Sequence, residues 1–517
     1  MGDVSAPLPR RPRKKPSNKP VNPTTHTRAL PTAADTDTGF LVAHTSKLRW
    51  RDRAHRALTA EAAPTWSLDL RAVTDGVDEQ RARRVLDLAM RIADSLLSTG
   101  ASAAEVTAAV LRIRAVYGLR SVHVDVTFTS ISVCHYRGAE PPITLIRNVS
   151  TRTQDYERLA RLQRLVNDIE GDIVSLNEAR QRFESIMAMP RLYRRSLVTA
   201  AYALLGVSVC LLLGGSTPEV VLSLVNAVIV DRSQLWLARR KLPTFFTQVV
   251  GGAIPTTMAV ALVYARLDEV PGLERVSASA VVATGIVVLL AGLSVVGAAQ
   301  DAIDGYYITA SARAFEVVVL TMGIIVGVLM VLTLSTTLGA PMYLSAYEGM
   351  TGDVGLQVVS SALIAVAFAI SSYAGGRTVA LCMVTGSVGW GVYALTVDAL
   401  GAAAASGVAA LVVGTCAQVF GRVWTVPGLA LSTAGIVPLL PGLAVYRGLY
   451  HLATNDGREG YGPAFDSLGG AVAVGLALAA GVSLGAYLGR ATRRRSGAIV
   501  DKATDRALRP AHADSKE

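Results

Sequence analysis

Charged residues are scarce in this sequence, and their scarcity is uneven. Only 17% of the 517 residues are Asp, Glu, Lys or Arg, whereas 51% are hydrophobic and the mean hydropathy is +0.40. A soluble protein would have about a quarter of its residues charged. Arg, Asp and Glu are frequent up to about Arg195, and long uncharged runs follow. This pattern excludes a soluble multidomain protein and predicts an integral membrane protein.

Cysteine is also rare, and two common nucleotide- and metal-binding signatures are missing. The four cysteines form no CxxC pair and no Cys/His cluster, which excludes a structural zinc site or a disulfide framework. The sequence contains neither a P-loop nor an HExxH motif. We therefore expect neither an enzyme nor a nucleotide-driven pump, and we expect no metal and no cofactor.

Composition divides the chain into five segments. We predict a disordered, basic, Pro/Thr-rich tail at 1–78 and a cytosolic α+β domain at 79–190. Two membrane segments follow at 191–337 and 338–490, and a basic cytosolic tail ends the chain at 491–517. The net charge of +11 does not predict a nucleic-acid partner, because Lys and Arg gather on the cytoplasmic loops of membrane proteins. The predicted partner of the apolar half is the lipid bilayer.

The segment 79–190 changes its hydrophobic period from that of a helix to that of a strand. Apolar residues at helical spacing predict a first helix that Gly100 ends. Ser102 and Glu105 predict a capping box at the start of a second helix. Alternating side chains then predict three strands, near 122–128, 131–136 and 143–147. A final helix completes the order α-α-β-β-β-α of an α+β domain.

That final helix is predicted to be long, from Asp155 to Met189, with Pro190 after it. Its apolar residues step by three and four in a heptad seam from Leu159 through Ile173 to Leu176. The seam would pack against the α+β domain or against a second copy of the chain. Formation of a homo-oligomer is therefore left open.

The remaining sequence contains enough apolar runs for ten transmembrane helices, since about 20 residues cross a bilayer. Nine runs carry no charge, and one more, Val220–Leu237, contains Asp231 and Arg232. The ten are Ser196–Pro218, Val220–Leu237, Leu242–Ala265, Val276–Gln300, Val317–Tyr347, Val354–Gly376, Thr378–Val397, Ala399–Gly421, Val423–Tyr446 and Ser467–Gly489.

The distribution of Lys and Arg predicts the orientation of these helices. If residue 195 is inside, the inner connections carry thirteen Lys and Arg residues and the outer ones carry four. The positive-inside rule then predicts a multi-pass protein of the cytoplasmic membrane with both termini in the cytoplasm.

Ten helices can be two sets of five, and an odd-numbered unit repeated in tandem must be inverted. At an offset of 143 residues, Gly285 matches Gly428, Gly305 matches Gly448 and Tyr307 matches Tyr450. These matches align the fourth helix of the set with the ninth. We therefore predict an inverted repeat of five plus five helices.

The ninth apolar run is the most interrupted. Pro438, Pro441 and Gly442 predict that this helix breaks, because proline removes a backbone donor and clashes with an earlier carbonyl. Unwound backbone at membrane depth is tolerated where it is buried in protein or lines a cavity. Tyr446 and Arg447 follow the break, and we place them with it in the predicted pathway.

Carboxylates near apolar runs are the other candidates for a substrate and proton pathway. Asp301 and Asp304 lie one turn apart at the end of the fourth run, and Arg313 and Glu316 open the fifth. Carboxylates inside a membrane are costly and usually face an interior path that carries protons or cations. Asp231 is a similar case, for which a local ion pair with Arg232 is the simpler explanation.

Three stretches resemble the threonine/serine exporter family of bacteria. They are SLLSTGASAAEV (Ser95–Val106), VVGAAQDAIDGYYITASARAFE (Val295–Glu316) and GIVPLLPGLAVYRGLY (Gly435–Tyr450). The resemblance covers about Val85 to Arg490. It implies a cytosolic domain fused to ten spans and export of small amino acids driven by the proton motive force.

We therefore predict a proton-coupled secondary transporter that exports threonine or serine. The sequence leaves two alternatives. A dicarboxylate exporter would need two cationic contacts, for which Arg313 and Arg447 are available. A membrane-anchored enzyme or sensor would act through the cytosolic domain instead.

Overall fold

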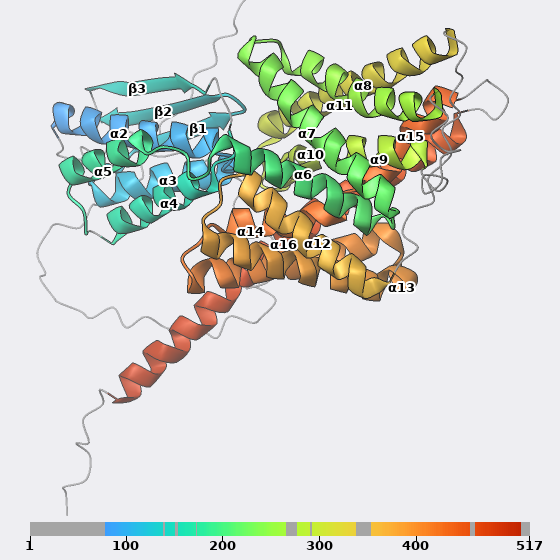
Figure 1. Ribbon diagram of the computed structural model, residues 1–517. Helices are drawn as coiled ribbons and strands as arrows, with labels where there is room; N and C mark the ends of the chain where they lie inside the picture. The colour runs from blue at the N-terminus through green and yellow to red at the C-terminus, as the bar shows by residue number, and fades with distance from the viewer. Residues whose placement is uncertain are drawn as a thin grey trace, which may run out of the picture. The chain divides into compact units, whose positions relative to one another are not determined.

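A computed structural model describes residues 78–137, 140–149, 153–171, 173–264, 277–289, 292–337, 353–454 and 461–507 (Figure 1). The described part is mostly helical and has one small sheet near its N-terminal end. The basic tail predicted at 1–78 lies outside the described residues except for Asp78.

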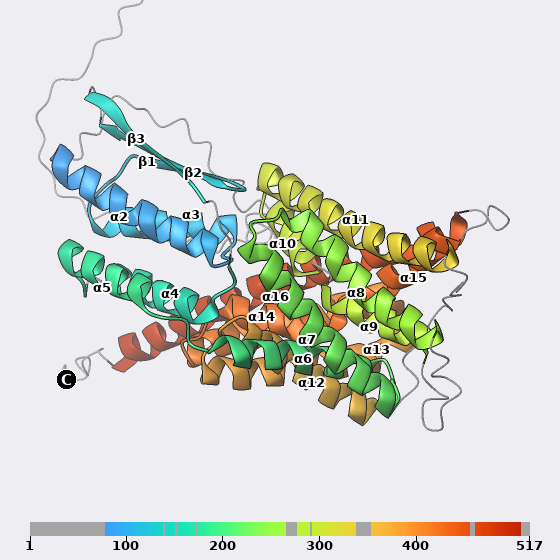
Figure 2. The ribbon, with the colours of Figure 1, turned by 45° about the horizontal axis from the view of Figure 1, so that its top comes forward.

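The N-terminal region has three layers (Figures 1 and 2). Helices α2 (Glu79–Ser98) and α3 (Ala103–Val116) form the middle layer. The sheet packs on one side of them, and α4 (Tyr156–Glu170) and α5 (Leu176–Ala188) lie on the other. The predicted capping position of α3 is confirmed, because the Ser102 side chain accepts a hydrogen bond of 3.2 Å from the Glu105 backbone N–H.

The sheet is antiparallel with the order β1-β2-β3. Its strands are β1 (Val122–Thr127), β2 (Ser130–Arg137) and β3 (Glu140–Asn148). In this register Val124 pairs with Val133, which pairs with Leu145 on its other side. All three strands expected from the alternating pattern are therefore present.

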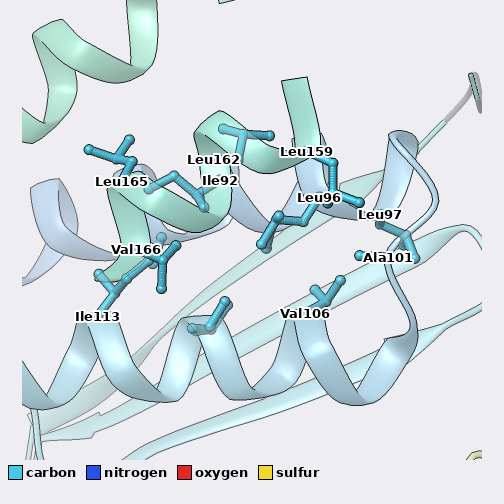
Figure 3. Close-up of a cluster of buried hydrophobic side chains, with 14 of the residues drawn as sticks. Ile92, Leu96, Leu97, Ala101, Val106, Ile113, Leu159, Leu162, Leu165 and Val166 are labelled. Carbon is cyan, nitrogen blue, oxygen red and sulfur yellow. The ribbon is translucent and has the colours of Figure 1, made fainter. Parts of the chain in front are cut away.

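Large aliphatic side chains fill the space between α2, α3 and α4. Leu96 of α2, Val106 of α3, and Leu162 and Val166 of α4 belong to one cluster of buried side chains, which Figure 3 shows. Each of them is at most 3% exposed. Their burial supplies the hydrophobic stabilisation of this layer, about 1.5–3 kcal/mol for each large aliphatic side chain.

The single long helix expected over Asp155–Met189 is wrong. The helix ends at Glu170, and Ser175 begins a new one by accepting a hydrogen bond from the Glu178 backbone N–H. Gly171 lies where the first helix ends, as glycine commonly does. The heptad seam ends there too, because Ile173 is 70% exposed.

Seven described helices are long and apolar enough to cross a membrane, or eight if one bent pair counts as a span. They are α6 (Arg195–Leu212), α7 (Thr217–Arg239), α8 (Thr244–Tyr264), α11 (Tyr307–Thr337), α12 (Val354–Ser371), α13 (Gly376–Val423) and residues Gly462–Gly489 of α16 (Gly462–Ala507). The segment 491–507, expected to be part of a tail, continues α16 as helix.

Helix α13 is too long for one span and contains a break. Its 48 residues would extend about 72 Å, more than twice the thickness of the hydrocarbon core. Gly401 has φ 75° and ψ 165°, a conformation outside the helical region that glycine adopts readily. Residues 376–400 and 402–423 are therefore two helices, in agreement with the two apolar runs expected there.

Glycine makes the closest helix contacts in the membrane region. A β-carbon at Gly327 of α11 would collide with the Val249 carbonyl of α8, and one at Gly485 of α16 would collide with the Leu411 carbonyl of α13. Both glycines belong to a GxxxG pair, a common device for close helix packing in lipid. The run Gly481–Gly485 also matches the hydrolase pattern GxSxG. It is continuous helix here rather than the strand-to-helix corner that such a nucleophile needs.

Candidate functional site

A cavity of about 830 Å³ lies among the helices. Its walls come from both membrane segments. The first segment contributes α6, α10 (Gly292–Ile303) and α11, and the second contributes α12, α13, α14 (Gly428–Ile436), α15 (Gly442–Thr454) and α16. Residues at the end of α2, before α3 and at the start of α4 in the α+β domain also line it. The volume falls within the range of about 300–1,000 Å³ typical of small-molecule sites.

A broken helix forms one wall of the cavity. Helix α14 (Gly428–Ile436) passes into a 3-10 turn, η2 (Val437–Leu439), and α15 (Gly442–Thr454) continues at an angle of 45°. Pro438 and Pro441 cannot donate backbone hydrogen bonds, so the helical ladder is interrupted here. The predicted break is confirmed, and Pro438, Pro441 and Gly442 all line the cavity. The C-terminal end of α14 and the N-terminal end of α15 therefore meet at the same space.

A buried ion pair joins α10 and α11, which form a second wall of the cavity. Nη1 of Arg313 in α11 lies 2.8 Å from Oδ2 of Asp301 in α10, and the Asp301 side chain is fully buried. Gly297, one turn before Asp301 on α10, leaves room for the guanidinium, which lies 3.2 Å from where a β-carbon would be. The structure thus brings together two residues that the sequence singled out. The carboxylate fixes a cavity-lining arginine in place.

A second ion pair has the same construction. Asp231 of α7 is buried, pairs with Arg195 at the start of α6, and accepts a hydrogen bond of 2.8 Å from the Thr199 hydroxyl. Arg195 lines the cavity. The suggested local pair of Asp231 with Arg232 is not formed, and Arg232 is exposed. Adjacent residues on a helix do not face the same side, so the partner of Asp231 comes from another helix.

Comparison with known proteins identifies the family. A family model described as "Putative threonine/serine exporter" matches residues 87–335, and one described as "Threonine/Serine exporter, ThrE" matches residues 357–487. A "Probable threonine/serine exporter" of Mycobacterium tuberculosis is 38% identical over 439 residues, which are 82% of this chain and 80% of the relative. The chain belongs to the threonine/serine exporter family. The "Threonine/serine exporter" of Corynebacterium glutamicum is 33% identical over 448 residues, 86% of this chain and 90% of the relative. No solved structure is significantly similar to the chain.

In this member of the exporter family, positive charge dominates the cavity wall. Four arginines line the cavity, and Glu316 is the one carboxylate among the described lining residues. The arginines are Arg191, Arg195, Arg313 and Arg447. Two of them are balanced by the buried carboxylates of Asp231 and Asp301. The cavity is therefore suited to a ligand that carries at least one carboxylate.

Of the other residues expected in the pathway, two line the cavity and two do not. Glu316 lines the cavity, and the residue is exposed. Arg447 lines the cavity from α15. Asp304 is exposed in the turn between α10 and α11. Tyr446 is 1% exposed and packs in an apolar cluster with Val282 and Ile286 of α9 (Ala278–Leu289). The structure therefore separates Asp304 and Tyr446 from the lining residues.

Several lining residues had no signal in the sequence. Arg191 and Arg195 resemble ordinary inner-loop charges, and the cation expected beside Asp231 was Arg232. Aromatic and hydroxyl side chains such as Tyr202, Trp390 and Ser432 also line the cavity. Such residues are common in membrane helices, so their position could not be inferred from their type.

Proposed function

We propose that this protein exports threonine and serine across the cytoplasmic membrane as a secondary transporter driven by the proton motive force. The observation that carries the proposal is the cavity between the two membrane segments, with a broken helix on one side and paired arginines on the other. Discontinuous helices at the interface of two repeats are the usual substrate sites of secondary transporters. The family of the chain supplies the substrate class.

The two ends of the broken helix suit the two charges of an amino acid. The N-terminal end of α15 carries a partial positive charge and would attract the substrate carboxylate, together with a cavity arginine such as Arg313. The C-terminal end of α14 carries a partial negative charge and would attract the ammonium group. Hydroxyls of Ser432 and Thr433 line the same wall and could bind the hydroxyl of the substrate.

Glu316 couples transport to protons in this proposal. Its ionised carboxylate would attract the ammonium of the substrate, and its protonated form would not, so proton and substrate compete for one group. Such competition is what exchange of an internal amino acid for an external proton requires. Arg313, one turn before Glu316 on α11, is held by Asp301 and would bind the carboxylate in both states.

The membrane region is proposed to contain ten spans arranged as an inverted repeat. In the first half α6 packs on α7, α8 on α11, and α10 on α11; in the second, α12 packs on α13, α13 on α16, and α15 on α16. The fourth unit of each half consists of two short helices, α9 with α10 and α14 with α15. The two family models also end and begin close to the boundary of the halves, at residues 335 and 357. These correspondences support the repeat.

Both termini are proposed to be cytoplasmic. The α+β domain forms hydrogen bonds with Thr309, Ser372 and Tyr373, which all lie at helix ends expected inside from the Lys and Arg distribution. A cysteine in place of Arg240, in the turn after α7, tests this orientation. An impermeant thiol reagent should label it in inverted vesicles and not in whole cells. Labelling in whole cells would contradict the topology.

A dicarboxylate exporter is the second candidate, because four arginines line the cavity. Counterflow of radiolabelled threonine, serine and succinate in proteoliposomes, with and without a pH gradient, separates the two. We expect threonine and serine to exchange, and to accumulate against their gradients only when a pH gradient is imposed. Exchange of succinate alone would favour the second candidate.

The coupling role of Glu316 has its own test. Glu316→Gln keeps the shape of the side chain but holds it neutral, so we expect substrate exchange without accumulation driven by a pH gradient. The double variant Asp301→Asn/Asp304→Asn examines the neighbouring carboxylates in the same assay. Gradient-driven accumulation at the wild-type rate in both variants would rule out this cluster, and Asp231 would be examined next.

A further inference from the structure

The α+β domain forms part of the cavity itself. Ser98, Gly100 and Ser102 from the connection between α2 and α3 line it, as do Thr153, Gln154 and Tyr156 at the start of α4. These residues belong to one end of the domain. Any molecule that enters the cavity from that side must pass between the domain and the membrane helices.

The first attachment of the domain joins the ends of two helices. Backbone N–H groups of Tyr156 and Glu157, at the start of α4, donate to the carbonyls of Ser372 and Tyr373 at the end of α12, at 3.0 and 3.2 Å. The first N–H groups and the last carbonyls of a helix have no partners within it. The two helix ends thus satisfy each other here, and water could replace either partner if they separated.

The second attachment is the side chain of Tyr156. It is 3% exposed, its ring lies 6.2 Å from that of Phe368 on α12, and its hydroxyl is 2.7 Å from the Thr433 hydroxyl on α14. Burial raises the pKa of the Tyr156 phenol well above its usual value, so the hydroxyl remains protonated at physiological pH. Tyr156 therefore connects the domain directly to the broken helix.

The third attachment is the turn between β1 and β2. The Phe128 backbone N–H donates to the Thr309 hydroxyl of α11 at 3.1 Å, and that hydroxyl is 3.1 Å from the Val126 carbonyl. Thr309 precedes Arg313 by one turn on the same helix. The domain thus contacts α11 close to the ion pair and α14 close to the break.

Two attachments contain aromatic residues in the left-handed region. Phe128 has φ 29° and Tyr373 has φ 56°, values that bulky side chains rarely adopt. The guanidinium of Arg191 lies over the Tyr373 ring, 5.3 Å from its centroid. Arg191 belongs to the segment that joins the domain to α6. Phe128 lies in the two-residue turn between β1 and β2, and Tyr373 follows the last turn of α12, where the Ala374 backbone N–H donates to the Ala369 carbonyl. Each conformation therefore belongs to its own element.

We propose that the α+β domain is the cytoplasmic gate of the substrate cavity. Docked as seen here, it closes the cavity on that side; separation of α4 from α12 and α14 opens it. Tyr156 is the latch. The inference rests on the proposed function only in that an exporter must admit its substrate from the cytoplasm.

The test fixes the domain in its docked position and measures access to the cavity. Glu157 and Gly375 suit a cross-link, because a β-carbon at Gly375 would lie 2.6 Å from Glu157 Oε2 and neither residue lines the cavity. Glu157→Cys/Gly375→Cys is built in a background without the native cysteines, with Ser294→Cys as a reporter in the cavity wall. An impermeant maleimide is then applied to inverted vesicles of the full-length protein, before and after oxidation of the pair.

We expect oxidation to lower the labelling rate of the reporter by about tenfold or more, and a reducing agent to restore it. A matched control restores Cys134 to this background and joins it to Thr144→Cys, because the two positions face each other across β2 and β3 within the domain. Oxidation of that pair should leave labelling unchanged. Equal labelling before and after cross-linking of Glu157→Cys/Gly375→Cys would overturn the gate.

A variant of the latch provides a second test. Tyr156→Phe removes the hydroxyl that meets Thr433 and should speed labelling, whereas Tyr117→Phe, which loses a hydrogen bond inside the domain to Val174, should not. No change of labelling in Tyr156→Phe would also count against the gate.

The labelling assay does not use threonine, so the two proposals can fail separately. Absence of threonine and serine transport by the wild-type protein, together with gated labelling, would reject the substrate and keep the gate. Threonine transport that continues in the cross-linked protein would reject the gate and keep the exporter.

Discussion

The α+β domain and the membrane helices are packed by opposite kinds of side chain. Most of the largest fully buried side chains belong to the domain, among them Leu86, Ile92 and Leu162. In the membrane region the close contacts are made by small residues such as Gly386, which meets Ser361 and Ala365. Large apolar side chains there point outward instead: Leu395, for example, is 85% exposed.

The difference follows from the solvent that each region faces. In water, burial of a large aliphatic side chain is favourable because it removes apolar surface from water. Against lipid that gain is missing, so helices associate through close backbone approach and polar contacts. The same amino acid should therefore have different importance in the two regions, and substitutions can measure this.

The largest effect is expected from charges placed in the core of the domain. Val166→Asp/Ile169→Asp should remove the whole stability of the domain, on the order of 5–15 kcal/mol, because two unpaired carboxylates would be buried. Limited proteolysis of the full-length protein should then cleave within 79–188. Ile173→Asp is the control, since Ile173 is 70% exposed. Equal protease resistance of the double variant and the control would mean that α4 does not carry the core.

The next effect compares a buried ion pair with an exposed one. Asp301→Asn leaves the Arg313 guanidinium, whose side chain is 13% exposed, without its buried carboxylate partner, which costs about 3–5 kcal/mol. Glu170→Gln removes the exposed partner of Arg112 in the domain and should cost no more than about 1 kcal/mol. Thermal unfolding in detergent measures both. Similar midpoints for the two variants would show that the Asp301 site is hydrated.

One substitution made in both regions tests the comparison most directly. Leu162→Ala in the domain core should lower the free energy of unfolding by about 2–5 kcal/mol. Leu395→Ala on the outer surface of α13 should change it by less than about 0.5 kcal/mol. Thermal unfolding in lipid nanodiscs provides both values. A large loss for Leu395→Ala would indicate that another protein surface covers this side chain.

The smallest effect concerns a single methyl group between helices. Gly485→Ala would place a β-carbon against the Leu411 carbonyl and should cost about 1–3 kcal/mol through strain. Gly469→Ala, on the same helix with open space around it, should instead stabilise by up to about 1 kcal/mol. Unfolding midpoints in detergent distinguish the two. A neutral Gly485→Ala would mean that α13 and α16 separate without cost.

The local features of this protein follow from the sequence alone. The strands, the cap at Ser102 and the break after Ile436 are each produced by a few neighbouring residues: alternating side chains, a hydroxyl before a helix, and two prolines three apart. The prediction of a single long helix over Asp155–Met189 was wrong for a local reason as well. Ser175 with Glu178 is the same capping pattern as Ser102 with Glu105, and it marks a new helix start after Gly171.

The pairing of distant residues was decided by the tertiary structure. Asp301 and Arg313 could be associated in advance because only one turn between helices separates them, but Asp231 finds Arg195 thirty-six residues away. Tyr156 meets Thr433 across 277 residues. Nothing in the composition of either segment marks these contacts. They depend on which helix faces which, and that choice is made by close packing of small residues over whole helix surfaces, not by the few residues that later form the cavity.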